Sequence, residues 1–572
     1  MKRTIRIFGL VLVCCIYIQT ALAIAPIPAS TQPGVIGNII SESLPPPSNP
    51  SVKPEIPKPE EAKVPYNAEA AKIHFKLKKI ILTGNTVYTT QQLEELYKNK
   101  LNTEMSVLDF QKIVQSITNY YRNNGYILSR AIIPPQHVKN GIINVQVIEG
   151  FVDVVKIQGD SRNSTRILEK YGKHISDSRP LHLSVLERYL RLANEVPGVQ
   201  VKSVLEASKK TPAAANMIFV VTEQRLGGYL SYDNYGTRYL GPHELTLNVT
   251  LKSGFSSGDA FGVTYLDTTR PKELRFLDAY YQLPIGGDGM SIVFDGNQSL
   301  TDSGFVLQPF DVIGNAVNYY VNLQYPLIRS IDQSLNLDGG LIYYHGVVTS
   351  LAKLLYDDNI RSARFGGNYL FSDRFRGTNS IYMHVEQGLP VFGATSNPQS
   401  LFTSRFGATG VFTKLTLQYA RDQALYDRFS AFFQFNGQYS FNPLLSYEQF
   451  TWGGSLMGRG YDPAELIGDQ GVGASIELRM NIYPGFRFLQ DMQLYGYYDI
   501  GQVWDLRNIE LTLNHFTELS AASAGGGLRF NFNKYITGNF MVTQPLTKQV
   551  AALELIGNGR DPRLFFGVSA SL

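Results

Sequence analysis

Cysteine is almost absent from this 572-residue sequence, and its two copies, Cys14 and Cys15, lie close to the start. Residues 1–23 combine three basic side chains, a short apolar run and a final Ala-Leu-Ala, which is the pattern of a cleaved signal peptide. Both cysteines would leave with this leader. The exported chain would then contain no disulfide framework and no thiolate metal site.

Charge and long apolar runs are also scarce. Charged residues make up 17% of the chain, below the share of about 25% that is usual in soluble proteins. The formal net charge is only +4 and part of it belongs to the leader, so we expect no nucleic-acid partner. After the leader, no stretch reaches the roughly 18 consecutive apolar residues of a transmembrane helix. These absences predict an exported protein without a helical membrane span.

The sequence also lacks the common motifs of catalysis. Its eight histidines form no HExxH pair, and no GxxxxGKS/T phosphate-binding loop is present. The stretch GDQGVG at Gly468–Gly473 has some likeness to a phosphate loop, but we interpret it as a loop that leads into the strand ASIELRMNI. We therefore predict no enzyme activity, no metal ion and no cofactor.

Residues 24–73 are dominated by proline and serine, as in LPPPSNPSVKPEIPKPEEAKVP. Such a composition is typical of an extended linker that packs little of its own surface. The apolar patch GVIGNII, Gly34–Ile40, has room for one or two helical turns only. We predict a linker across this whole segment.

Residues 74–150 and 151–224 repeat one pattern of strand, helix, helix, strand and strand. In the first unit, Ser106 is placed to cap a helix with apolar helical spacing, and Gly125 is placed to end it. Each unit has the length of a small independent domain. The pattern predicts two α+β domains in tandem.

Residues 225–572 hold most of the 34 tyrosines and 32 phenylalanines, and their segments alternate between apolar and polar side chains. In SIELRMNI, for example, Ile476 and Leu478 alternate with Glu477 and Arg479. A soluble sandwich also alternates, but its outer faces would carry more charge. The aromatic load and the signal peptide favour a closed transmembrane antiparallel β-barrel, with lipid outside and polar side chains inside.

The last segment, RLFFGVSASL, places Phe566, Val568 and Leu572 on one apolar face. A strand that runs to an apolar terminus resembles the assembly signal of outer-membrane barrels, although the usual terminal residue is aromatic. The resemblance implies insertion by the barrel assembly machinery into outer-membrane lipid.

The junction IIPPQHVKNGIINVQVIEGFVDVVKIQG, Ile132–Gly159, resembles the corresponding segment of two-partner secretion transporters. These transporters belong to the Omp85 superfamily, in which polypeptide-transport-associated (POTRA) domains precede the barrel. Pro134 and Pro135 would end a strand, and Gly141 would permit the next turn. The resemblance implies two POTRA-like domains and a barrel of 16 strands. Some members plug the pore with an amphipathic N-terminal helix, and residues 24–73 show no clear helix of that kind.

The stretch FTWGGSLMGRGYDP resembles the sixth extracellular loop of the same family, whose core is Gly458, Arg459, Gly460 and Tyr461. The family often has valine at the position of Gly458. The resemblance implies that this loop folds back into the barrel lumen, where Arg459 reaches an aspartate of a neighbouring strand.

The stretch YGYYDIGQVW supplies the matching strand motif through Tyr497, Asp499 and Gly501. The alternation of the strand supports this independently. If Leu494 and Tyr498 face lipid, then Asp499 faces the lumen, where a charge is tolerable.

The resemblance implies an outer-membrane pore of a two-partner secretion system. Its periplasmic domains would bind a large unfolded exoprotein, such as a hemolysin or an adhesin, by adding a strand to a sheet edge. The exoprotein would then cross the barrel without ATP. One alternative is an outer-membrane protein assembly factor of the same superfamily, which usually carries more POTRA domains. Another is a porin or adhesin barrel, which needs no loop tucked into its lumen.

Overall fold

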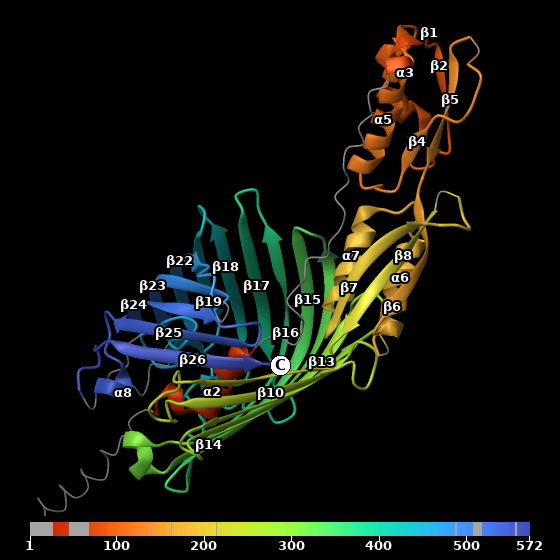
Figure 1. The fold of residues 1–572 in the computed structure, drawn as a ribbon. Coiled ribbons are helices and arrows are strands. Elements are labelled where there is room, and N and C mark those ends of the chain that lie inside the picture. Colours follow the sequence, from red (N-terminus) through yellow and green to blue (C-terminus); the bar gives the residue numbers. More distant parts are fainter. Residues whose placement is uncertain are drawn as a thin grey trace, which may run out of the picture.

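The computed structural model describes residues 27–44, 68–138, 140–161, 163–212, 214–486, 489–506, 518–554 and 557–572. The predicted signal peptide lies outside these residues. Two α+β domains form an arm that projects from a β-barrel, and helix α2 lies inside the barrel (Figure 1). Among the described residues, no helix is both long enough and apolar enough to cross a membrane.

The first arm domain follows the predicted order, with the first strand divided in two. Its sheet has the order β2-β5-β4, and β1 pairs with β3 beside it. Ser106 caps α5 by accepting a hydrogen bond from the Asp109 N–H, as predicted. The elements are α3 (Ala68–Lys72), β1 (His74–Lys76), β2 (Lys79–Thr83), α4 (Thr90–Glu94), η2 (Lys98–Lys100), β3 (Glu104–Ser106), α5 (Val107–Asn123), β4 (Arg130–Ile132) and β5 (Ile142–Ile148).

The junction motif has a physical basis in this domain. Strand β4 ends just before Pro134, and the Gln136 side chain then replaces the lost strand pairing. Its amide donates to the Asn144 carbonyl at 2.7 Å and accepts from the Asn144 N–H at 2.8 Å. Gly141 takes a φ of 74°, which favours glycine at this turn.

Glu149, at the end of the same motif, links two other segments of the domain through hydrogen bonds. Its carboxylate accepts hydrogen bonds from the Thr86 and Val87 N–H groups at 2.7 and 2.9 Å and from the Tyr121 hydroxyl at 2.8 Å. Burial alone would raise the pKa of Glu149, but these hydrogen bonds outweigh burial and hold the pKa below its ordinary value.

We expect Glu149→Gln to destabilise this domain by about 1.5 kcal/mol, the low end for hydrogen bonds to a charged group, because Glu149 is half-buried. Since the folded-state pKa is lowered, the stabilisation is complete above the unfolded pKa of about 4.3 and is lost as the pH falls through the folded value. Thermal unfolding followed by the helical circular-dichroism signal measures both effects. The exposed Glu104→Gln is the control, and an equal pH dependence of wild type and Glu149→Gln would contradict the expectation.

The second arm domain repeats the pattern and rests on the barrel. Its sheet has the order β6-β8-β7, and its two helices cover one face. Arg188 pairs with Asp288 of a barrel turn at 3.1 Å, and Glu195 pairs with Arg329 at 2.8 Å. The elements are β6 (Phe151–Gly159), α6 (Thr165–Asp177), α7 (Leu183–Glu195), β7 (Val199–Ala207) and β8 (Ala214–Glu223).

The barrel is closed by sixteen antiparallel strands, and its last strand pairs with its first. The strand number agrees with the number that the resemblance implies. The strands are β9 (Leu226–Asp233), β10 (Glu244–Lys252), β11 (Ala260–Thr268), β12 (Leu274–Pro284), β13 (Ser291–Asp302), β14 (Val312–Arg329), β15 (Gln333–Ser350), β16 (Lys353–Ser372), β17 (Gly377–Gly388), β18 (Thr413–Ala424), β19 (Phe429–Ser440), β22 (Gln470–Ile482), β23 (Asp491–Trp504), β24 (Glu518–Asn531), β25 (Ile536–Pro545) and β26 (Arg563–Ser571).

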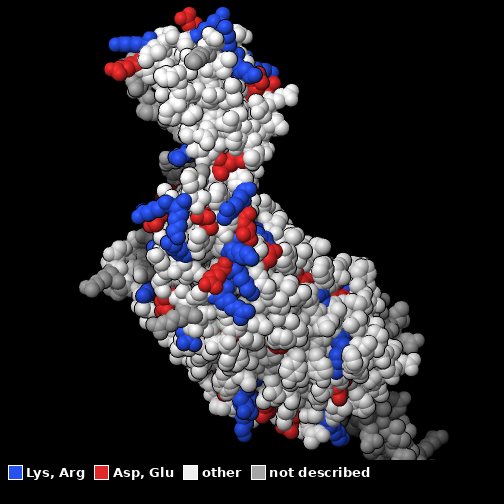
Figure 2. Space-filling model, turned by 90° about the vertical axis from the view of Figure 1, so that its right-hand side faces the viewer, with Lys and Arg blue, Asp and Glu red and all other residues white. Residues whose placement is uncertain are grey.

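The strand faces follow the predicted alternation. On β23, Leu494 and Tyr498 are 44% and 42% exposed and face outward, whereas Tyr497 and Asp499 are buried toward the lumen. Figure 2 shows charged side chains gathered on the arm and sparse over most of the visible barrel wall. An apolar outer wall with few charges is the surface that lipid requires.

The interpretation of residues 24–73 as a linker with little packing is wrong for part of this segment. Pro33–Ser43 forms helix α2, which follows η1 (Ala29–Thr31) and lies in the barrel lumen (Figure 1). Val35, Ile36 and Ile40 are buried, and the Pro33 carbonyl accepts a hydrogen bond from the Ser299 hydroxyl on the barrel wall at 2.5 Å. Contacts with the barrel stabilise a short helix that is marginal by itself.

Candidate functional site

Loop six, residues 441–469, joins β19 to β22 at the barrel end remote from the arm. A small hairpin of β20 (Phe450–Trp452) and β21 (Leu466–Gly468) presents the segment SLMGRGYDP at its tip. Gly453 and Gly458 take φ values of 119° and 77°, where other residues are strained. This conformation explains glycine at position 458.

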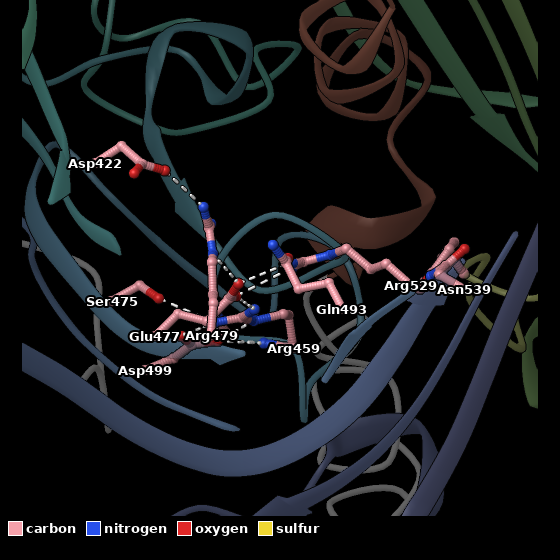
Figure 3. A network of polar contacts seen from close by, with 11 residues as sticks. Asp422, Arg459, Ser475, Glu477, Arg479, Gln493, Asp499, Arg529 and Asn539 are labelled. Atoms are coloured by element: carbon pink, nitrogen blue, oxygen red, sulfur yellow. Dashed lines mark hydrogen bonds and ion pairs between the residues drawn. The ribbon is translucent and has the colours of Figure 1, made fainter. Parts of the chain in front are cut away.

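Arg459 points from the loop tip to the inner wall of the barrel (Figure 3). Its guanidinium donates to both carboxylate oxygens of Asp499, at 2.8 and 3.0 Å, and to Glu477 at 2.6 Å. The guanidinium also lies 3.5 Å above the centre of the Tyr497 ring. Arg459 is only 6% exposed and Asp499 is fully buried. The planar fork of arginine suits this bidentate contact with a carboxylate.

Glu477 extends the contact into a network that the sequence interpretation did not include. Its carboxylate also accepts from Arg479 and Arg529, each at 2.6 Å (Figure 3). Arg529 further donates to Gln493 at 2.8 Å. The alternation of SIELRMNI already placed Glu477 and Arg479 together on the lumen side, but the contacts of Glu477 with Arg459 and Arg529 depend on the loop fold and on strand register.

Gly460 and Tyr461 seat the loop tip against β24 and the loop that follows β25. Gly460 approaches the wall so closely that a Cβ atom would lie 2.7 Å from the Ser523 Cβ. The Tyr461 ring is buried, and its hydroxyl lies 3.1 and 3.0 Å from the carbonyl oxygens of Ala522 and Lys548. All four residues of the predicted loop motif therefore lie at one contact with the barrel wall.

Residues 218–530 match the family described as haemolysin secretion/activation protein ShlB/FhaC/HecB, and residues 75–150 match the ShlB-type POTRA domain. The chain belongs to the ShlB/FhaC/HecB family. It is an outer-membrane protein of the two-partner secretion type, with its POTRA domains in the periplasm, so the end of the barrel remote from the arm faces outward.

Relatives of this ShlB/FhaC/HecB chain match it over most of its length at low sequence identity. The heme/hemopexin transporter protein HuxB of Haemophilus influenzae is 22% identical over 86% of this chain and 87% of its own. The hemolysin transporter protein HpmB of Proteus mirabilis is 25% identical over 69% of this chain and 70% of its own. The solved structure of CdiB from Escherichia coli has a TM-score of 0.71 at 18% identity and covers 89% of this chain and 93% of that one.

Gly501, the third residue of the predicted wall motif, has a steric role in the ShlB/FhaC/HecB chain. It pairs with Gly473 across β22 and β23, and the Trp452 ring of loop six packs on these two glycines. A Cβ atom at Gly501 would lie 2.6 Å from the Trp452 ring.

We expect Gly501→Val to displace Trp452 and to lower the thermal stability of the barrel by about 1–3 kcal/mol, the usual penalty of overpacking. The unfolding temperature in detergent measures the effect. Gly496→Val on the same strand is the matched control, because a Cβ there would have only one neighbour within 4 Å, at 3.9 Å. Equal stability of the two variants would contradict the expectation.

A second ion pair holds loop six on β18, three strands along the barrel wall from β23, and the sequence interpretation missed it. Glu448, in η4 (Ser446–Glu448), pairs with Lys414 of β18 at 2.5 Å, and both side chains are buried. The segment η4 also contacts α2. Loop six of this ShlB/FhaC/HecB chain is therefore fixed at two separate points of the barrel wall and contacts the helix inside the lumen.

The predicted assembly-signal residues lie on the outer face of the last strand, β26. Val568 and Leu572 are exposed toward lipid, and the Phe566 ring packs 5.8 Å from the Tyr232 ring on β9. This face is apolar, as expected. Recognition of these side chains by an assembly machinery stays a prediction.

Proposed function

We propose that the chain captures a large unfolded exoprotein in the periplasm and passes it through the barrel to the cell surface. HuxB is described as a heme/hemopexin transporter and HpmB as a hemolysin transporter, so a hemolysin- or adhesin-like exoprotein is the expected cargo. The observation that carries the proposal is a barrel whose lumen contains loop six and α2 and which bears a periplasmic POTRA arm.

The arm offers sheet edges for the capture step. Strand β2 is an edge of the first sheet, and β6 and β7 are the edges of the second. Ile81 on β2 and Val204 on β7 are exposed, so an added strand would find apolar side chains beside free backbone groups. Backbone pairing accepts many sequences, which suits an unfolded partner.

Loop six is the positioned element of the proposed pore. Arg459 and Glu448 fix it at two points of the barrel wall, on β23 and β18, and α2 contacts it inside the lumen. Passage of a polypeptide therefore requires α2 and part of the loop contacts to move. We propose that folding of the exoprotein outside gives direction, without ATP and without a catalytic step.

The test is deletion of this protein, followed by mass spectrometry of the culture supernatant and of the outer membrane. We expect one large exoprotein to disappear from the supernatant and to return when the wild-type protein is supplied again. General loss of outer-membrane barrels would support the assembly-factor alternative instead. An unchanged supernatant with reduced uptake of small solutes would support a porin.

Assembly of the barrel itself gives the second element of the proposal. The apolar face of β26, with Phe566, Val568 and Leu572, would be read by the barrel assembly machinery before insertion into outer-membrane lipid. Replacing all three side chains with serine should reduce the amount of the protein in the outer membrane. The chemically similar exchange Leu572→Phe should preserve it.

A further inference from the structure

The seam at which the barrel closes is short. Strand β26 pairs with β9 only over Gly567–Ser571 and Tyr229–Asp233, whereas β9 pairs with β10 over its whole length. The outward part of β26 runs on to Arg563, four residues or about 13 Å beyond the last backbone pair. This part of the seam has no strand on the β9 side.

Side chains continue the seam where β9 ends. The Asn234 side chain donates to the Leu564 carbonyl at 3.0 Å and accepts from the Phe566 N–H at 2.7 Å. The Tyr235 ring stacks on the Phe565 ring, with centroids 5.6 Å apart. Loop one, residues 234–243, is therefore fastened along the outward half of β26.

Asp462 of loop six joins both sides of this seam at its outer end. One carboxylate oxygen accepts from the Arg563 guanidinium on β26 at 2.6 Å, and the other accepts from the Thr237 hydroxyl of loop one at 3.2 Å. Arg563 also donates to the Gly460 carbonyl at 3.1 Å. Asp462 and Thr237 are buried, so water does not compete well for these hydrogen bonds.

We propose that Asp462 is a positioning residue that clamps the first and last strands of the barrel together, so that closure of the seam depends on loop six being seated. Asp462 lies three residues after Arg459, and the same loop tip carries both contacts. Movement of the tip away from Asp499 would also withdraw Asp462 from Arg563 and Thr237. The barrel seam and the loop-six site thus act as one unit, whatever molecule the pore carries.

Hydrogen exchange of the full-length protein in lipid nanodiscs tests this proposal, because exchange reports local opening of backbone pairs. In Asp462→Ala, amides of β9 and β26 should exchange about tenfold faster or more, the ordinary effect of losing a hydrogen bond to a charged group. Amides of β15 and β16, on another part of the wall, should keep the wild-type rate. Equal rates at the seam, or equal acceleration in all strands, would overturn the proposal.

Asp427→Ala is the control, since it removes an acid whose side chain is 65% exposed in the turn between β18 and β19, outside loop six and away from the seam. It should leave β9 and β26 at the wild-type rate, and acceleration equal to that of Asp462→Ala would overturn the special role of Asp462. If Asp462→Ala fails to assemble, Thr237→Val removes one seam contact and should accelerate the same amides to a smaller extent. Where both variants assemble, their effects should be less than additive, because they break one interaction.

Discussion

Replacing Arg459 with alanine should reduce the exported partner in the culture supernatant at least tenfold while the barrel remains in the outer membrane. The change leaves the buried Asp499 without its cation, which costs about 3–5 kcal/mol for a buried pair. The population of the seated loop would then fall about a hundredfold or more relative to the unseated loop. Immunoblots of the supernatant and of outer-membrane fractions measure the two quantities separately.

Two further variants separate the geometry of Arg459 from its charge. Arg459→Lys keeps the charge but has no planar fork for two carboxylates, so we expect an intermediate loss of secretion. Arg428→Ala removes an arginine that is 59% exposed beside a barrel turn and should secrete normally. Normal secretion by Arg459→Ala would show that the loop-six contact has no role in transport.

Deleting Pro33–Ser43 should raise the single-channel conductance of the purified protein severalfold. Helix α2 occupies the lumen against β13 and β14, and its removal leaves a water-filled path beside loop six. Measurement in planar lipid bilayers, together with the sensitivity of cells to large antibiotics, reports the opened path. The rise should stay below that of an empty barrel, because Phe412, Leu444 and Leu445 still pack inside it.

A point substitution tests the same role of α2 without shortening the chain. A Cβ atom added at Gly34 would lie 2.1 Å from the Tyr344 hydroxyl oxygen. The Tyr344 ring is held in place by stacking on the Tyr447 ring, with the ring centroids 3.9 Å apart. Gly34→Leu should therefore expel α2 and open the pore. Ser43→Ala, at an exposed position of the same helix, is the control and should conduct like the wild type. Unchanged conductance in both the deletion and Gly34→Leu would contradict a closing role for α2.

The barrel was predictable because a strand has a period of two. Once Leu494 and Tyr498 are assigned to lipid, the lumen position of Asp499 follows from the backbone alone. The same reasoning places Glu477 and Arg479 of one strand side by side on the lumen side, although the further partner Arg529 on β24 depends on the register of β22, β23 and β24. Alternation gives the face of a residue but not its partner on another strand.

Helix α2 was not predictable by the same means. Its sequence contains Gly34 and Gly37, which lower helix propensity and weaken any apolar pattern. The structure gives both glycines a reason, because Tyr344 and Ser299 leave no room for side chains there. Small residues that favour close packing in a lumen thus look like linker residues when the sequence is read alone.

The position of α2 also determines how the lumen can be filled again after an exoprotein has crossed the barrel. Ile27 packs near Val312 and Tyr356 at the outer end of the barrel, while the chain resumes at Ala68 in the periplasmic arm. The intervening residues 45–67 can reach at most about 80 Å. If α2 leaves the lumen, it therefore stays tethered to the barrel of the same chain, at an effective concentration on the order of millimolar. Resealing is then a unimolecular event whose speed does not depend on how much protein the membrane contains.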